Sequence, residues 1–363
     1  MALIKLSKSS LNNKEIQKVN KVLKKEFLGM GKEVNSFENK LSNYFKRDVV
    51  CVVNGFAALH LALEANEIGV DDEVLVPSLT YVATFQAISA VGAKPVSCDI
   101  DLETLNISVS EIKKKISSKT KAIMPVWFGG NPEGIFDIYR IAKTFNIRVI
   151  EDSAHAFGSQ IKNKLIGSFG NISCFSFDGI KNITSGEGGC IVSSDKRIIK
   201  KIKEKRVLGI RLKHANKKWQ PQVNTQGWRY HMSNIMAAIG LVQFDKKNLL
   251  KKKRQSIAKT YDKMLIDNKS YKIFKRDYNK INPHIYPILN LKQSTKKLLI
   301  YMKKNNIEVG RHYFPNHLLN KYKSERLKNT EYIANKIITL PIHGDLTITQ
   351  QLKVISCLKN FHR

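Results

Sequence analysis

One lysine in the sequence has a setting that suits chemistry. Lys181 lies in FSFDGIKNITSGEGG (175–189), between a short apolar run and a glycine-rich turn. The apolar run predicts a strand, and the loop after it is rich in small and polar residues, so this lysine does not belong to a helix face. The glycines follow the lysine, which is the wrong order for the phosphate loop G-x-x-x-x-G-K-[ST]. The position indicates an amine held against a ligand rather than one more surface charge.

A carboxylate and a glycine turn end two other predicted strands. Asp152 directly follows the apolar part of IRVIED, where a buried carboxylate is costly unless it meets a positive partner. A helix cap is the alternative for this aspartate. His155 comes three residues later, but no H-x-H or H-x-x-x-H spacing completes a ligand set, so no metal site is expected. After the predicted strand VVCVV, Gly55 begins a helix whose first N–H groups could hold a phosphate. A glycine at this position is equally typical of a purely structural turn.

These three features are expected at one edge of the sheet, because an open α/β sheet binds ligands at the carboxyl ends of its strands. A phosphate needs N–H donors, a pyridine nitrogen needs a carboxylate, and an aldehyde needs an amine. The set therefore suits pyridoxal 5′-phosphate (PLP).

The elements that must position these residues alternate between strand and helix, which predicts an α/β fold with a parallel sheet. Two amphipathic helices are predicted first, over 14–28 and 33–45. The predicted strands are 49–53, 73–77, 94–100, 121–128, 147–152, 171–177 and 190–194.

The pattern changes near residue 242. A long lysine-rich helix over 244–265 is followed by a strand-like segment at 284–291, a helix at 295–306, a short strand at 307–313 and a final amphipathic helix. We predict a large PLP-binding domain over 1–245 and a smaller α+β domain over 246–363.

The chain of 363 residues has 62 Lys and Arg against 30 Asp and Glu, a formal net charge of +32. Such a charge could attract nucleic acid or a smaller anion such as a nucleotide-linked substrate, and biased codon usage is a simpler explanation. The basic runs, such as 201–206 and 251–254, fall on predicted solvated helix faces, and no nucleic-acid-binding motif accompanies them. We expect no nucleic-acid partner.

The five cysteines are scattered and form no C-x-x-C pair, which argues against a disulfide framework and fits a reducing compartment. No apolar run approaches the roughly 18 residues that span a bilayer. The first residues, MALIKLSKSSLNNKE, lack the apolar segment of a signal peptide. We expect a cytoplasmic protein with no membrane partner.

The sequence resembles the DegT/DnrJ/EryC1/StrS family of sugar aminotransferases, which have the aspartate-aminotransferase fold (fold type I). The likeness covers nearly the whole chain and includes NGFAALHLAL, VIEDSAHAFGS, SFGNISCFSFDGIKNITSGEGG and GWRYHMSNIMAAIGLVQF. It implies a large domain with a mostly parallel seven-stranded sheet flanked by helices, and a smaller C-terminal α+β domain.

The resemblance also implies roles for single residues around PLP. Lys181 would form the Schiff base with the cofactor. Asp152 would pair with the ring nitrogen, His155 would lie near the 3-hydroxyl, and Tyr81 would stack on the ring.

The same resemblance implies a phosphate site made of Gly55, Phe56 and Ser176. Arg229 falls where the family has a residue that reaches the phosphate from the neighbouring subunit, which implies a homodimer with shared active sites.

Four residues depart from the family's usual pattern. Phe56 replaces a threonine, Trp127 a common histidine, Arg229 a frequent asparagine and His231 a frequent arginine. Phe56 leaves only its main-chain N–H for the phosphate, and Arg229 could compensate with a stronger contact. We expect the substrate subclass to depend on the loops of Trp127, His231 and 311–317. Within that last segment, His312 and His317 either face the substrate or are solvated.

The implied reaction moves an amino group from an amino acid, L-glutamate in most of the family, to a nucleotide-linked 4-keto-6-deoxyhexose for a surface glycan or related natural product. Related sugar dehydratases carry histidine at the lysine position, and a desulfurase would need an exposed cysteine, whereas Cys174 and Cys190 fall inside predicted strands. The competing class is a basic binding or regulatory protein on an inactive aminotransferase scaffold.

Overall fold

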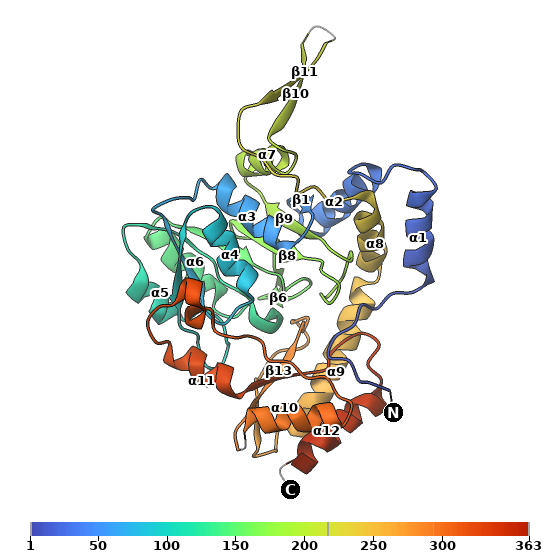
Figure 1. Ribbon diagram of the computed structural model, residues 1–363, viewed down its shortest axis with the longest axis vertical. Coiled ribbons are helices and arrows are strands. Elements are labelled where there is room, and N and C mark those ends of the chain that lie inside the picture. Colours follow the sequence, from blue (N-terminus) through green and yellow to red (C-terminus); the bar gives the residue numbers. More distant parts are fainter. Residues whose placement is uncertain (1, 216–217, 293, 362–363) are drawn as a thin grey trace.

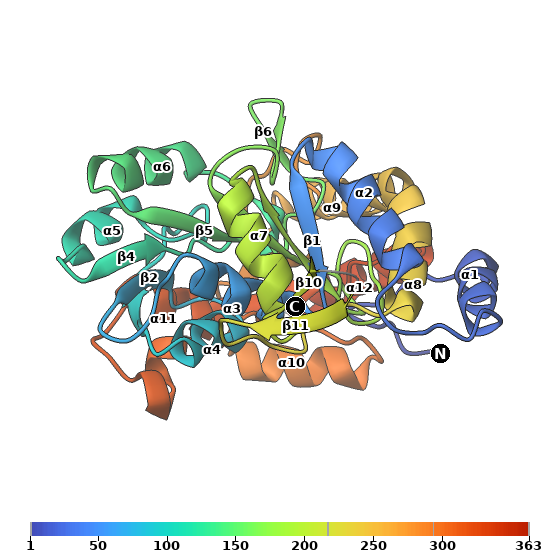
Figure 2. The ribbon, with the colours of Figure 1, turned by 90° about the horizontal axis from the view of Figure 1, so that it is seen from above.

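A mostly parallel sheet of seven strands forms the centre of the larger part of the molecule (Figures 1 and 2). The computed structural model describes residues 2–215, 218–292 and 294–361. The strand order is β1-β9-β8-β5-β4-β2-β3, and every neighbouring pair is parallel except the two pairs that β9 makes. The strands are β1 (Asp48–Val52), β2 (Glu73–Pro77), β3 (Lys94–Cys98), β4 (Thr120–Ile123), β5 (Arg148–Asp152), β8 (Ile172–Ser176) and β9 (Gly189–Ser193). The predicted fold is confirmed.

Each face of this sheet packs against its own apolar core, because side chains alternate along a strand. In β1, Val49 and Cys51 belong to one core, and Val50 and Val52 to the other. Helices α2, α5, α6 and α8 cover the first core, and α3, α4 and α7 cover the second. These helices are α2 (Lys32–Phe45), α3 (Gly55–Ala65), α4 (Val82–Ala90), α5 (Val109–Lys115), α6 (Ile135–Thr144), α7 (Lys196–Lys205) and α8 (Asn234–Asp245). Covered on both faces, the strands read as nearly continuous apolar runs.

Three smaller elements extend from this body. Helix α1 (Asn13–Leu23) packs on α8 and begins with a capping box formed by Asn12 and Glu15. A hairpin of β10 (Ile210–Ala215) and β11 (Lys218–Val223) projects away from the sheet (Figure 1). A shorter hairpin joins β6 (Gln160–Ile161) to β7 (Lys164–Leu165). Neither hairpin is predicted from the sequence; β6 and β7 span only two residues each, too few to show a period-2 pattern.

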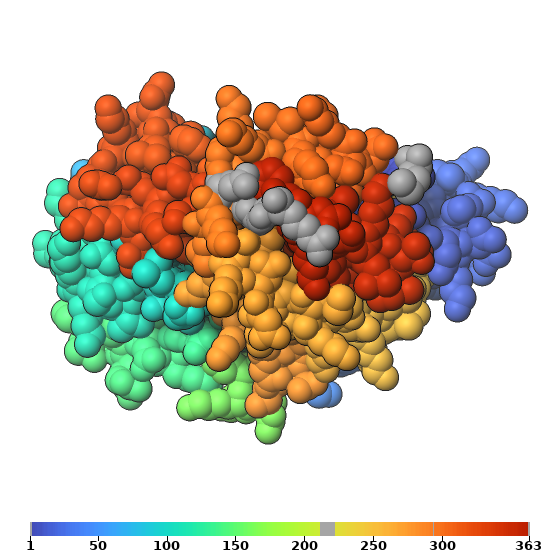
Figure 3. Space-filling model, turned by 90° about the horizontal axis from the view of Figure 1, so that it is seen from below, coloured from blue at the N-terminus to red at the C-terminus, as the bar shows by residue number. Residues whose placement is uncertain are grey.

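The C-terminal part is built on the three-stranded antiparallel sheet β12-β13-β14. Its apolar side chains form a further core, which also takes in Ile4 from the start of the chain. Figure 3 shows the C-terminal elements gathered on one face of the molecule, in orange and red. They are α9 (Lys247–Leu265), β12 (Tyr271–Ile273), β13 (Tyr286–Asn290), α10 (Thr295–Lys304), α11 (Lys328–Lys336), β14 (Ile337–Leu340) and α12 (Ile348–Phe361).

The strand predicted over 307–313 is wrong. This segment makes only single β-bridges, from Ile307 to Ile4 and from Gly310 to Thr339. Its main chain then turns away from the small sheet and runs toward the end of the large one, where residues 312 and 313 meet the carboxyl ends of the parallel strands. Periodicity cannot distinguish such a segment from a short edge strand.

The division into domains at residues 1–245 and 246–363 stays a prediction. All five cysteines are buried and free. Within the described ranges, no helix combines the length and apolar character that crossing a membrane requires.

Candidate active site

A cavity of about 460 Å³ opens at the carboxyl ends of β5 and β8, the end of an α/β sheet that binds ligands. The first residues of α3 and α4 line it from the large sheet, and residues 284, 312 and 313 line it from the C-terminal part. Its wall contains all but one of the predicted site residues, namely Gly55, Phe56, Tyr81, Asp152, His155, Ser176 and Lys181. The exception is Arg229, which is exposed and lies outside this cavity.

One end of the cavity is formed by the N-terminus of α3 and by Ser176. The Asn54 side chain caps α3 by accepting the Ala57 N–H at 2.8 Å, so the Gly55 and Phe56 N–H groups have no intrahelical acceptor. Ser176 Oγ accepts a main-chain N–H of the following loop at 3.3 Å, which leaves its own proton free to donate. A Cβ on Gly55 would lie 2.9 Å from Ser176 Cβ, so glycine is required. These donors suit an anion.

A buried carboxylate, that of Asp152 at the end of β5, lines the cavity. Thr84 Oγ1 donates to its Oδ2 at 2.8 Å, and the Ala154 N–H donates to its Oδ1 at 3.1 Å. Burial raises the pKa of Asp152, while these hydrogen bonds and the charge of Lys181 act in the opposite direction. A bound cation beside the carboxylate would stabilise its charged form.

Lys181 is presented by a turn that Asp178 organises. Sequence reasoning assigns no role to Asp178. In the structure its Oδ1 accepts the Ile180 N–H at 3.1 Å and its main-chain carbonyl accepts the Lys181 N–H at 3.0 Å. This Asx turn directs the lysine into the cavity. Burial lowers the pKa of Lys181, and the charges of Asp152 and Asp178 partly offset that shift. The amine is therefore more often uncharged than a surface lysine.

Two buried histidine rings lie beside the lysine. His155 Nδ1 accepts the Gly129 N–H at 3.3 Å, so its Nε2 carries the proton and donates to Tyr313 Oη at 2.9 Å. Burial lowers the pKa of His155 well below the ordinary value, and Lys181 adds to this effect. The ring centroid of His284 is 4.3 Å from that of His155, and its Nε2 is 3.5 Å from Lys181 Nζ.

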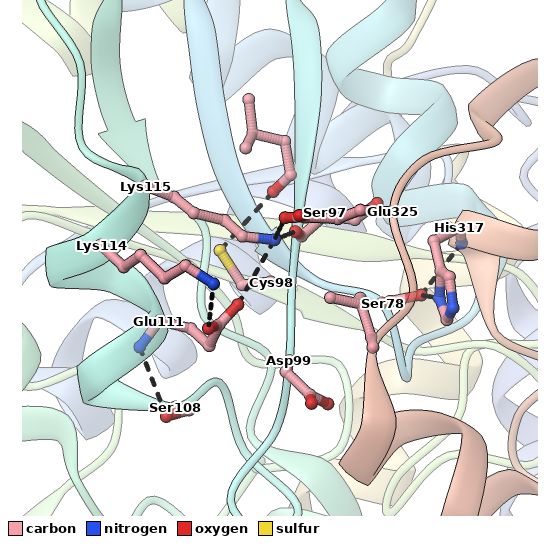
Figure 4. Close-up of polar contacts among 12 residues, drawn as sticks. Ser78, Ser97, Cys98, Asp99, Ser108, Glu111, Lys114, Lys115, His317 and Glu325 are labelled. Carbon is pink, nitrogen blue, oxygen red and sulfur yellow. Dashed lines mark hydrogen bonds and ion pairs between the residues drawn. The ribbon is translucent and has the colours of Figure 1, made fainter.

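The segment that carries residues 312 and 313 is fastened to the end of β2. Asn316 Nδ2 donates to the carbonyls of Ser78 and Thr80 at 3.0 and 2.8 Å. The His317 N–H donates to Ser78 Oγ, whose own proton is then free for His317 Nδ1 at 2.7 Å (Figure 4). His317 is fully buried, and its Nε2 lies 3.3 Å from Glu331. It therefore holds the segment in place and does not face the cavity.

A second set of hydrogen bonds attaches the C-terminal part to the end of β3. Asp99 accepts the N–H groups of Asn329 and Thr330 at 2.9 and 2.7 Å, and so caps the start of α11 from another element. Nearby, Lys115 Nζ is 2.8 Å from Glu325 and also donates to a carbonyl of β3 (Figure 4). These contacts fix the chain that follows residues 312 and 313 to the large sheet.

Comparison with known proteins identifies this arrangement. A sequence profile of the DegT/DnrJ/EryC1/StrS aminotransferase family matches residues 9–359. The chain belongs to this family. The resemblance inferred from the motifs is thereby confirmed.

Relatives of this aminotransferase family match over nearly their full lengths. GDP-perosamine synthase of Escherichia coli O157:H7 is 35% identical over 370 residues, which cover 100% of this chain and 99% of that protein. The structure of PseC from Helicobacter pylori, an aminotransferase of pseudoaminic acid biosynthesis, has a TM-score of 0.93 at 29% identity and covers 99% of both chains. The structure of TlmJ from Streptoalloteichus hindustanus has a TM-score of 0.94 at 26% identity, with 99% of this chain and 100% of TlmJ covered.

The cavity fits the cofactor predicted from the sequence. The open N–H groups of α3 and the Ser176 hydroxyl suit a phosphate, Asp152 needs a cationic partner such as a protonated pyridine nitrogen, and Lys181 supplies an amine. A Cβ on Gly189 would lie 2.6 Å from the Asn54 carbonyl oxygen, so the close approach of β9 to the turn before α3 also requires glycine. The relatives and this fit together confirm PLP as the cofactor.

Two residues that depart from the family's usual pattern do not line the cavity. Trp127 lies in the core, where its Nε1 donates to Glu151 at 2.9 Å, so its side chain is not part of the cavity. His231 also lies outside the cavity wall. His284 and Tyr313 are cavity residues that the sequence does not single out, because a lone histidine before a strand and a tyrosine in a loop carry no spacing signal.

Replacing Asp178 tests the turn that presents the lysine. Asp178→Ala should weaken PLP binding about fivefold, because the Ile180 N–H loses its acceptor and the loop is less ordered. Asp178→Asn keeps that acceptor and is the matched control, with an affinity close to that of the wild type. Fluorescence titration of the cofactor-free proteins with PLP measures both. Equal losses of PLP affinity in the two variants would show that the hydrogen bond of the Asx turn does not contribute to cofactor binding.

Proposed function

We propose that this family member transfers an amino group from L-glutamate to a nucleotide-linked 4-keto-6-deoxyhexose, for a surface glycan or related natural product. The observation that carries the proposal is the convergence of Lys181, Asp152 and the α3 N-terminus on one cavity. Named relatives support the substrate class, since they include GDP-perosamine synthase and PseC. We further propose that the reaction takes place in the cytoplasm.

PLP, when bound, supplies an aldehyde that bonds to amines and a ring that accepts electrons from the carbon next to the bonded nitrogen. In our proposal, Gly55, Phe56 and Ser176 hold its phosphate. Asp152 keeps a proton on its ring nitrogen, Tyr81 covers one face of its ring, and His155 faces its hydroxyl.

Lys181 has two tasks in this proposal. It binds the cofactor covalently in the resting enzyme, and its free amine moves protons during each half-reaction. Nζ takes the proton from the Cα of glutamate and, in the second half, delivers a proton to the sugar carbon that receives nitrogen. Burial lowers the pKa of Lys181, which favours the uncharged amine that this base needs.

We also propose that the enzyme is a homodimer in which Arg229 reaches the phosphate of the partner's cofactor. Arg229 is exposed and lies outside the cavity of its own chain. Two residues that line that cavity are exposed and apolar, Tyr81 and Ile180, at 61% and 40% exposed. A second copy over the cavity would bury them and bring in the guanidinium.

A direct assay tests the reaction. The purified protein, loaded with PLP, should convert a nucleotide-linked 4-keto-6-deoxyhexose to an amino sugar and form one 2-oxoglutarate for each product. Lys181→Ala should fold but lose at least about a thousandfold in turnover, since the proton carrier is gone. Lys143→Ala, on an exposed position of α6, is the control and should keep full activity. Near-normal turnover in Lys181→Ala would refute the mechanism.

Arg229→Ala tests the shared site. It should weaken PLP binding about tenfold without lowering the melting temperature of the cofactor-free protein, because a charged hydrogen bond to the phosphate is lost. Arg140→Ala, which removes an exposed arginine of α6, should have no effect.

Co-expression of Arg229→Ala with Lys181→Ala tests directly whether the two subunits share their active sites. Each mixed dimer would have one site with both native residues. At a PLP concentration too low to fill the Arg229→Ala sites, about a quarter of the wild-type activity should therefore return. No recovery together with unchanged PLP affinity would contradict the shared site.

A further inference from the structure

Helix α9 carries a buried positive charge that has no negative partner. Arg254 is 3% exposed, and no carboxylate of the described residues lies within ion-pair distance of its guanidinium. Burial lowers the pKa of Arg254 to about 10, so the group remains charged at neutral pH. A buried, unpaired charge costs several kcal/mol of stability in general. Packing alone therefore does not explain why a charged side chain occupies this position.

The contacts of Arg254 lead to the active site. Its Nη1 donates to the main-chain carbonyls of His284 and Ile342, at 3.2 and 3.1 Å. The His284 N–H donates to the Gly129 carbonyl at 3.3 Å, so both sides of this residue's main chain are fixed. The His284 ring then points into the cavity, with Nε2 3.5 Å from Lys181 Nζ.

We propose that Arg254 is a positioning residue for Lys181: it fixes His284 beside Nζ, and its unpaired positive charge favours the uncharged amine. The inference rests on the proposed role of Lys181 as the proton carrier. A cation that kept a carboxylate partner would be neutralised and could not act in this way. The absence of a partner is therefore what gives Arg254 its effect on the site.

The electrostatic surroundings of the amine are consistent with this role. Negative groups near Lys181 raise its pKa, whereas Arg254 lowers it in addition to burial. Arg254 also contributes to the low pKa of His284, after burial and Lys181, so the ring beside the amine stays neutral. The titratable and charged groups around Lys181 are Asp152, Asp178, Glu187, Tyr313, His155, His284, His312 and Arg254.

Competitive labelling of the cofactor-free protein tests the proposal without using activity. Trace acetic anhydride is applied across a pH series, and mass spectrometry of the Lys181 peptide gives the pH of half-maximal labelling. Arg254→Gln keeps N–H donors but removes the charge, so the half-labelling pH should rise and labelling at pH 8 should fall about threefold. Arg254→Lys keeps a positive charge and should remain close to the wild type.

Two further variants distinguish an effect of the Arg254 charge from a general disturbance of the structure. Arg276→Gln is the control, because Arg276 is half-buried and also donates to main-chain carbonyls, those of Glu103 and Thr104, yet does not act on Lys181. It should leave the half-labelling pH unchanged. If Arg254→Gln does not fold, Arg254→Met replaces it, since an apolar residue of similar volume is often tolerated in place of a buried charge.

The outcomes are distinct. A higher half-labelling pH in the neutral variants, with no rise in Arg254→Lys or Arg276→Gln, supports the proposal. An unchanged half-labelling pH in the neutral variants, or an equal rise in Arg254→Lys, overturns it. Failure of the proposed reaction would appear separately, as a wild-type protein that forms no amino sugar.

Discussion

The burial of a carboxylate and an amine in one cavity is the constraint on which the rest of this structure depends. Asp152 is buried and Lys181 is half-buried, and burial acts against the charged form of each. The mutual attraction of the two charges offsets part of this cost. PLP supplies the partner that each group lacks, a protonated nitrogen for the carboxylate and an aldehyde for the amine. The protein therefore places both groups where the cofactor needs them.

The main chain around the cavity is tightly constrained, and this places the carboxylate and the amine together. Glycines at 55 and 189 allow β1, β8, β9 and α3 to approach one another, and any Cβ there would collide with a neighbour. The Asx turn at Asp178 sets the direction of the lysine, and contacts from the ends of β2 and β3 hold the C-terminal wall. Side chains from distant parts of the chain therefore meet at one edge of the sheet.

Sequence reasoning locates the parts of this site that depend on local patterns. Apolar runs predict the seven strands, and the ends of two of them locate Asp152 and Ser176. The positions of His284 and Tyr313 depend on how segments a hundred or more residues apart pack together, as the Lys181–His284 contact shows. Asp178 acts through a local Asx turn, whose side-chain hydrogen bond the residue types alone do not fix. The place of Trp127 in the core depends on packing too, since the sequence does not show that it bonds to Glu151.

The central claim is that one lysine among 62 basic residues is the amine that binds the cofactor. Reduction of the PLP-loaded protein with borohydride fixes the cofactor to whichever amine holds it, and peptide mapping by mass spectrometry locates the label. The account predicts one label per chain, on the peptide that contains Lys181. A label on another lysine, or an unlabelled Lys181 in protein that has retained PLP, would contradict it.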